Sequence, residues 1–456
     1  MTILTNAETY LNTLGVNNGF GFEAWHPSVI DFLSDHGIAK WPNAETGYRY
    51  WGGLTSDYPE NPYLFVSDDK ETWIPAPTHA SQASAPNAHQ LDTQYNDEDK
   101  DEVYDSFAAD IELVYDPANN QLVAYWLREG TAFGGTGLAR CTISSTFLKS
   151  ATTLSIAGSV MNLLSPSIVP ESASSWHMWT VDAQTPFQIL YWSSADGIIW
   201  TGPTTCTSNA IQTAYGLRPW HISAKKNPFA QGRIDLFVTG YVHPITYGAY
   251  HGYPLVHAMT SLDDPTTIST PLAPDFLLAP AHDLTWWQAN GGGSSASGEW
   301  DGWGLYRSAS VLRGENNMVV ADVWYTGSDA QPRQVGTGDP MAKIGYTSGA
   351  LYGYSSAARG AETVTVTTWD GATIYADFDD ATPATERTSG ESFVIPEGAE
   401  TLYFYATDGT YTEDVQSFSV AVTQIKRING TTAGILKKLN GSTSGTIKRL
   451  INGSWN

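Results

Sequence analysis

The stretch from Tyr48 to Trp73 constrains the fold most, because approximate versions of it return four more times along the chain. It reads as an aromatic strand (YRYW), a polar turn-rich segment (DYPEN), a second strand (YLFV) and a polar turn that closes on a tryptophan. The later versions begin near residues 107, 165, 218 and 305. A repeated unit of this kind buries its apolar face only by stacking on its neighbours, so the pattern predicts a repeat architecture.

We therefore expect an all-β fold, in which a five-bladed β-propeller is followed by a small β-sandwich and a short C-terminal β-repeat tail. The composition agrees, since aromatic residues make up 12% of the chain, while 42 glycines and 24 prolines supply turns. The expected domains are an N-terminal helical segment (1–20), the propeller (21–355), an Ig-like or carbohydrate-binding-like sandwich (360–424) and a basic repeat tail (425–456). The blade repeats exceed the about 40–50 residues of a minimal blade, which predicts long loops.

Two turns carry aspartates whose predicted role is structural. The sequences SDDKETW (67–73) and SADGIIW (194–200) resemble the Asp-box of sialidase-type propellers. In such a turn the aspartate side chain accepts hydrogen bonds from its own backbone, while the tryptophan fills the blade core. We therefore expect Asp69 and Asp196 to hold turns rather than to catalyse.

Charge and cysteine content limit the partners. The formal net charge of −24 argues against nucleic acid and against an anionic membrane surface as partners. No apolar run reaches about 18 residues and no signal peptide is recognised, so we expect no membrane segment. Cys141 and Cys206 are expected to be two buried thiols, although the sequence does not exclude a disulfide.

A family resemblance rests on an ordered set of segments: WHP (25–27), YRYW (48–51), YPENPYLFVSDD (58–69), the strand of Asp110, RPWHIS (218–223) and LYRSA (305–309). Together they resemble bacterial and phage five-bladed β-propellers similar to furanosidase-type glycoside hydrolases. The resemblance covers residues 20–350. The IKRING-type repeats near the C-terminus resemble the ends of phage tail proteins.

The resemblance implies three carboxylates in a central funnel, and this chain matches two, Glu60 and Asp110. Trp220 and His221 stand where the third is expected. A glycoside hydrolase needs one carboxyl group as an acid and another as a base or nucleophile, about 5–9.5 Å apart. We therefore predict Glu60 and Asp110 as the catalytic pair, with His221 as a third catalytic candidate.

Further residues at the starts of the blades suit sugar binding. Aromatic faces pack against the C–H faces of sugar rings, and polar side chains fix orientation. The predicted substrate-binding residues are Trp25, His26, Arg49, Tyr58, Asn61, Arg218, Trp220, Trp286, Trp287, Tyr306 and Arg307.

The sequence leaves other chemistries open. A lyase acting on a uronic acid would use His221 or Tyr306 as the base and Arg218 or Arg307 to neutralise the carboxylate. No metal site or cofactor is predicted, because His243, His251 and His257 follow no zinc spacing and the acidic run at 96–102 lacks a calcium-loop glycine. A structural Ca²⁺ stays open.

The favoured function is a polysaccharide-degrading enzyme, most simply a glycosidase-type depolymerase. The alternatives are the lyase, a glycan-binding phage tail adhesin that cuts nothing, and a purely structural virion part. The expected partner is a polysaccharide, the expected location is a virion or the extracellular space, and the tail is expected to mediate attachment or homo-oligomerisation.

Overall fold

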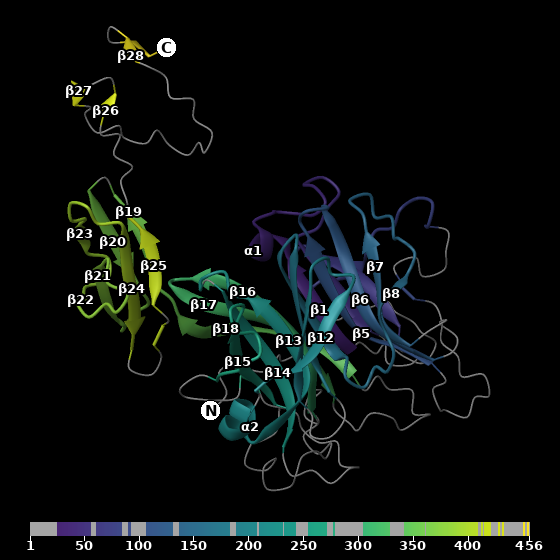
Figure 1. The fold of residues 1–456 in the computed structure, drawn as a ribbon. Coiled ribbons are helices and arrows are strands. Elements are labelled where there is room, and N and C mark those ends of the chain that lie inside the picture. The colour runs from purple at the N-terminus through teal and green to yellow at the C-terminus, as the bar shows by residue number, and fades with distance from the viewer. Residues whose placement is uncertain are drawn as a thin grey trace. The chain divides into compact units, whose positions relative to one another are not determined.

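A computed structural model of the 456-residue chain shows an all-β protein, as predicted (Figure 1). The residues that the structure describes are 25–55, 61–83, 90–92, 106–130, 136–182, 188–207, 209–230, 232–242, 254–270, 277–278, 304–328, 342–360, 362–408, 412–413, 415–420, 427–428, 431–432, 450–451 and 454–455. The predicted N-terminal helix at 1–20 and the acidic run at 96–102 lie outside them. No helix in the described part of the chain has the length and apolar character to cross a membrane.

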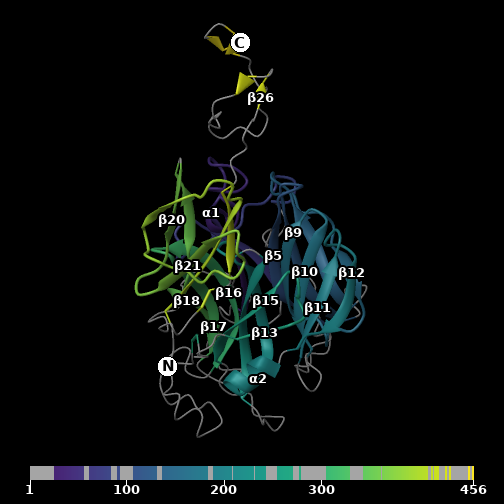
Figure 2. The same ribbon diagram turned by 60° about the vertical axis from the view of Figure 1, so that its left-hand side comes forward.

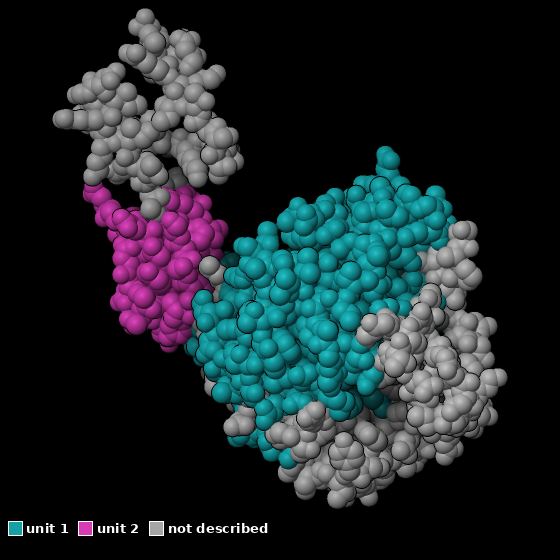
Figure 3. Space-filling view, turned by 45° about the vertical axis from the view of Figure 1, so that its right-hand side comes forward, with its two compact units in different colours: residues 1–356, 367–373, 406–414 teal, residues 357–366, 374–405, 415–456 magenta. Residues whose placement is uncertain are grey.

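The chain divides into two compact units (Figure 3). Unit 1 comprises residues 1–356, 367–373 and 406–414, and unit 2 comprises 357–366, 374–405 and 415–456.

Unit 1 contains five antiparallel sheets in which strands follow one another in chain order. The first three sheets are β1 (Trp25–Asp31), β2 (Tyr50–Thr55), β3 (Pro62–Ser67), β4 (Ile74–Pro75); β5 (Ser106–Asp116), β6 (Gln121–Gly130), β7 (Gly137–Ile143), β8 (Thr153–Ala157); and β9 (Leu164–Ser172), β10 (Ser175–Val181), β11 (Ile189–Ser194), β12 (Trp200–Thr205). The last two are β13 (Leu217–Lys226), β14 (Arg233–Val242), β15 (Leu255–Ser261); and β16 (Gly304–Glu315), β17 (Met318–Ser328), β18 (Ala342–Gly353). Two short helices accompany them, α1 (Phe32–His36) and α2 (Asn209–Tyr215).

The first strands of the five sheets contact one another in sequence. β1 contacts β5, β5 contacts β9, β9 contacts β13, β13 contacts β16, and β16 contacts β1 again. Figure 2 shows β5, β9, β13 and β16 gathered toward the middle of unit 1. Five apolar clusters fill the spaces between consecutive sheets, and the fifth joins the last sheet to the first through residues such as Val311, Trp324, Val29 and Tyr50.

The two predicted Asp-box turns are confirmed. Asp69 Oδ1 accepts hydrogen bonds from the backbone N–H groups of Glu71 and Thr72. Asp196 Oδ1 accepts from the N–H groups of Ile198 and Ile199 in the same way. Both aspartates therefore serve the turns.

Both cysteines are free thiols and are buried, as expected. Burial raises the pKa of Cys141 and of Cys206 to about 12, so neither is a reactive thiolate at neutral pH.

Unit 2 contains strands with a clear alternation of buried and half-exposed residues, as in β20 (Thr363–Thr367) and β24 (Thr401–Thr407). Its two sheets have the orders β19–β20–β23 and β22–β21–β24–β25, with β19 (Ser356–Arg359), β21 (Thr373–Phe378), β22 (Glu386–Arg387), β23 (Ser392–Val394) and β25 (Gln416–Ser419). The tail region holds two antiparallel pairs, β26 (Arg427–Ile428) with β27 (Thr431–Thr432) and β28 (Leu450–Ile451) with β29 (Ser454–Trp455).

Candidate functional site

The candidate site is built where the five first strands begin. Each of these strands has an irregularity in its pairing with its neighbour close to its start, typical of a β-bulge. A bulge adds a residue to one strand and redirects a side chain, and bulges are common next to active sites. The residues within these irregular steps include His26, Asp110, Ser165, Trp220 and Tyr306.

Three of these residues have a left-handed backbone. The φ angles are 49° for His26, 54° for Asp110 and 50° for Ser165. For a non-glycine residue such a conformation costs about 1–3 kcal/mol, so it persists only where the surrounding structure fixes it, often at functional sites. Three neighbouring first strands, β1, β5 and β9, therefore carry the same local strain at the same level.

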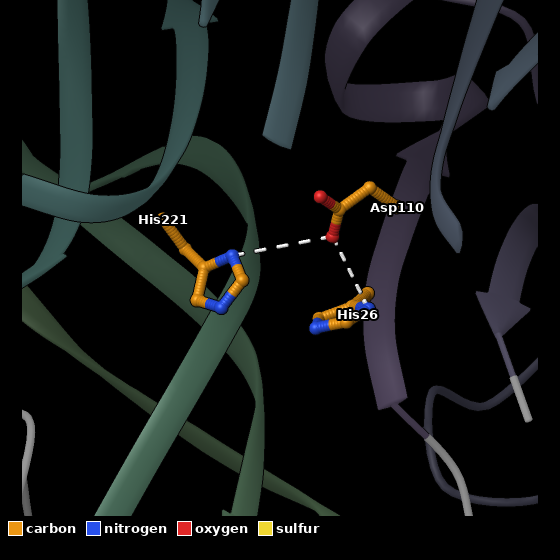
Figure 4. Close-up of side chains that lie close together, drawn as sticks. All are labelled: His26, Asp110 and His221. Carbon is orange, nitrogen blue, oxygen red and sulfur yellow. Dashed lines mark ion pairs between the residues drawn. The ribbon is translucent and has the colours of Figure 1, made fainter. Parts of the chain in front are cut away.

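His26, Asp110 and His221 converge from β1, β5 and β13 (Figure 4). His26 Nδ1 lies 3.2 Å from Asp110 Oδ1, and His221 Nδ1 lies 4.0 Å from the same oxygen. The two imidazole ring centroids are 4.9 Å apart. One potential ligand atom from each residue can be chosen so that all three lie within 4.8 Å of one another.

The electrostatics of this triad give neutral imidazoles and an ionised carboxylate. Burial lowers the pKa of His26 and lowers that of His221 well below its usual value, and the Arg307 guanidinium adds to both shifts. Burial alone would raise the pKa of Asp110, but the two histidines, Arg307 and the Ser165 N–H together lower it. These are the protonation states that metal ligation requires.

Asp110 Oδ1 and His221 Nε2 are buried without a hydrogen-bond partner among the described residues. An unpaired buried oxygen or nitrogen costs about 1–3 kcal/mol. A divalent cation would satisfy both atoms, and two imidazoles with one carboxylate form a donor set suited to zinc and similar metals. The residues present therefore fit a metal ion, which the sequence analysis did not predict.

A second buried network is centred on Arg307 and on Glu112, which follows Asp110 by two residues on β5. Arg307 Nη2 donates to Glu112 Oε2 at 2.6 Å and to the Pro166 carbonyl at 2.8 Å, and Nη1 donates to the Ile111 carbonyl at 2.9 Å. Glu112 also accepts hydrogen bonds from the Ser28 and Ser167 hydroxyls and the Ile168 N–H. The Ala224 N–H in turn donates to Ser167 Oγ, so the network joins all five first strands.

Two arginines predicted to bind substrate have other partners. Arg307 is fully buried with three protein acceptors, so it supports the centre and is not positioned to bind or neutralise a substrate. Arg49 forms an ion pair with Asp31 at the far end of β1 from His26, with Nη2 2.7 Å from Oδ2, and does not reach the site.

The structure describes four further predicted residues, of which Trp220 and Tyr306 lie near the triad. The Trp220 ring lies 5.5 Å from the His221 ring and is half-buried, and the Tyr306 ring lies 6.1 Å from His221 and is buried. Asn61 is buried just before β3, and Arg218 is half-buried at the start of β13.

The other five predicted residues lie wholly or partly outside the described part of the chain. Tyr58, Glu60, Trp286 and Trp287 lie outside it entirely, and for Trp25 only the backbone, at the start of β1, is described. The Glu60–Asp110 carboxylate pair therefore stays a prediction.

Sequence reasoning missed Ser165 and the metal-like donor set. One signal was available, because Trp-His occurs at the start of two blade repeats, at 25–26 and 220–221. Ser165 had no comparable signal, since serine is common in strands and turns.

Comparisons with known proteins show the fold. No protein-family model matches the chain, and no curated protein matches it. The chain resembles the solved structure of an N-acetylgalactosamine deacetylase from F. plautii in complex with blood group B trisaccharide, with 17% identity and a TM-score of 0.56, over 77% of this chain and 96% of that chain. At this identity the likeness establishes the fold alone.

Two further solved structures are more distant. A Penicillium chrysogenum α-L-arabinanase complexed with arabinobiose is 10% identical, over 92% of this chain and 97% of its own, with a TM-score of 0.36. A glycosyl hydrolase from Bacteroides ovatus is 11% identical, over 71% and 83%, with a TM-score of 0.39.

Proposed function

We propose that this chain is a metal-dependent hydrolase that acts on a glycan, with His26, Asp110 and His221 holding a divalent cation at the centre of a closed five-bladed β-propeller. The ring of contacts among β1, β5, β9, β13 and β16, and the apolar cluster between the last sheet and the first, support the closed propeller. The observation that carries the function is the convergence of two neutral imidazoles and one ionised carboxylate in one buried centre.

The bond that we propose for hydrolysis is an acyl bond on the sugar, such as an acetamido group. The deacetylase that shares the fold supports this substrate class. Water adds across the carbonyl–nitrogen bond, which yields acetate and an amino sugar. A divalent cation bound to the triad would supply Lewis acidity and a water of lowered pKa.

The chain's own residues would then perform three tasks. The triad would supply three protein ligands to the cation, the number typical of catalytic rather than structural metal sites. The half-buried Trp220 ring beside His221 offers a face for a sugar ring, whereas the Tyr306 ring is buried and supports the site from behind His221 only by packing. Arg307, held by the Glu112 network, favours neutral histidines and the ionised carboxylate.

Cleavage of a glycosidic bond is the second candidate, since Asp110 is a carboxylate in the expected position. It requires Glu60 as the partner, because Glu112 is committed to Arg307 and three other donors. The lyase alternative is left with Arg218 as its neutralising cation, because Arg307 is not available to a substrate. The adhesin alternative predicts glycan binding without turnover. For the enzyme and for the adhesin alike, we propose a virion or extracellular location with attachment through the tail.

The test is incubation with a panel of N- and O-acetylated glycans, with acetate, reducing ends and absorbance near 235 nm measured together. We expect acetate release that is abolished by a chelator, restored by Zn²⁺, Mn²⁺ or Co²⁺, and lost in Asp110→Asn and His221→Ala. New reducing ends that persist in a chelator and disappear in Glu60→Gln would replace this proposal with the glycosidase. Retained glycan binding with no product of any kind would favour the adhesin.

A further inference from the structure

Ser165 occupies a special place beside the triad. It is the second residue of β9, is fully buried, and has a left-handed backbone with φ of 50°. It lies in the irregular step between β9 and β10, at the same level as His26 on β1 and Asp110 on β5.

Ser165 contacts two of the three triad residues. Its backbone N–H donates to Asp110 Oδ2 at 2.9 Å, and its hydroxyl oxygen lies 2.6 Å from His221 Nδ1. These contacts engage one atom of each partner. The other atom of each, Asp110 Oδ1 and His221 Nε2, is the one without a hydrogen-bond partner among the described residues.

We propose that Ser165 is a positioning residue that selects Asp110 Oδ1 and His221 Nε2 as the two atoms presented to a divalent cation; this inference rests on the proposed function. For the imidazole, the selection requires that His221 Nδ1–H donates to Ser165 Oγ, which leaves the Nε2 lone pair for the metal. An outer hydrogen bond of this kind fixes the tautomer and the ring orientation of a metal-bound histidine. For the carboxylate, the backbone N–H of Ser165 fixes its rotation.

The competing interpretation is that Ser165 only stabilises the contact between β9 and β13. The two interpretations differ in what removal of the hydroxyl does to metal affinity. Ser165→Ala and Ser165→Gly both remove it and both keep the backbone N–H. Glycine suits a φ of 50° and alanine does not, so the glycine variant should unfold at the higher temperature.

The chain offers a matched control two residues along the same strand. Ser167 is also fully buried, and its hydroxyl serves the Glu112 network instead of the triad. Ser167→Ala therefore removes a buried hydroxyl from β9 without touching a triad residue.

The experiment titrates the chelator-treated full chain with Co²⁺ and measures affinity by calorimetry and coordination by the visible absorbance of the bound ion. We expect binding by the wild type, its loss in Asp110→Asn, and affinities about 10–100-fold weaker in both Ser165→Ala and Ser165→Gly, with altered absorbance. Ser167→Ala should weaken binding by less than about tenfold.

The outcomes separate this inference from the proposed function. Wild-type affinity in both Ser165 variants overturns the positioning role and leaves the metal site intact. A Co²⁺ affinity that is weakened in Ser165→Ala but restored in the more stable Ser165→Gly also overturns the positioning role, because the affinity would then depend on stability and not on the hydroxyl. Absence of Co²⁺ binding by the wild type overturns the proposed function, and the positioning role with it.

Discussion

The buried ion pair between Arg307 and Glu112 makes a strong prediction about stability. Arg307→Met keeps much of the side-chain volume but removes the cation, so the Glu112 carboxylate stays buried without its partner. Breaking one side of a buried pair costs about 3–5 kcal/mol. Three hydrogen bonds to Glu112 survive, which lowers this cost, whereas the carbonyls of Ile111 and Pro166 lose their donor, which raises it. We therefore expect a loss of about 4 kcal/mol in the free energy of unfolding.

A double-mutant cycle isolates the charge. Glu112→Gln keeps an oxygen acceptor for the serine hydroxyls but removes the negative charge. In Arg307→Met with Glu112→Gln the unpaired charge of Glu112 is gone, so the double variant should be about 2 kcal/mol more stable than Arg307→Met alone.

The assay is equilibrium unfolding in urea with a chelator present, followed by tryptophan fluorescence, because all of the 17 tryptophans except Trp455 belong to unit 1. Arg313→Met is the control on the same strand, since Arg313 is partly exposed and Asp322 keeps Lys70 as a second cation. It should cost about 1 kcal/mol or less. An Arg307→Met variant no less stable than Arg313→Met, or a double variant no better than Arg307→Met, would refute the reasoning.

Three further predictions concern other parts of the described chain. Burial alone would raise the pKa of Asp235, but Arg233 and the hydrogen bonds from His257 and Tyr352 lower it to about 2. The ionised Asp235 carboxylate therefore stabilises the fold fully above about pH 4, and this stabilisation is lost as the pH falls through 2. Over that interval the wild type should lose about 2 kcal/mol more stability than Asp235→Asn, as measured by urea unfolding of both proteins. Asp196→Ala removes the acceptor of the Ile198 and Ile199 N–H groups and should cost about 1 kcal/mol by thermal unfolding, whereas an unchanged midpoint would contradict the turn role. Gly353→Ala places a methyl group 1.8 Å from the Trp369 ring and should cost about 3 kcal/mol or more by urea unfolding, and a wild-type midpoint would show that the ring moves freely.

The sequence predicted those features whose cause is local. The Asp69 and Asp196 turns depend on hydrogen bonds within four residues, so their motif was sufficient. The strand starts that carry Asp110 and His221 were recognised because the blade pattern repeats.

The rest depends on contacts that no local pattern records. The triad unites residues from three different sheets, and Ser165 acquires its role only because β9 lies between β5 and β13. Arg307 was predicted to bind substrate because it stands at the start of a blade, next to the central funnel. The irregular pairing at Leu305–Ser308 accompanies a side chain that is fully buried instead.

The central hydrogen-bond network also has a consequence for synthesis of the chain. Glu112 belongs to the second sheet, and its cationic partner belongs to the fifth, which a ribosome makes almost 200 residues later. Until β16 is made, a nascent chain that has already packed β5 would hold an uncompensated carboxylate at its centre. Truncated products that end before β16 therefore bury this carboxylate without its cation, and we expect them to be less stable and more readily degraded than the finished protein.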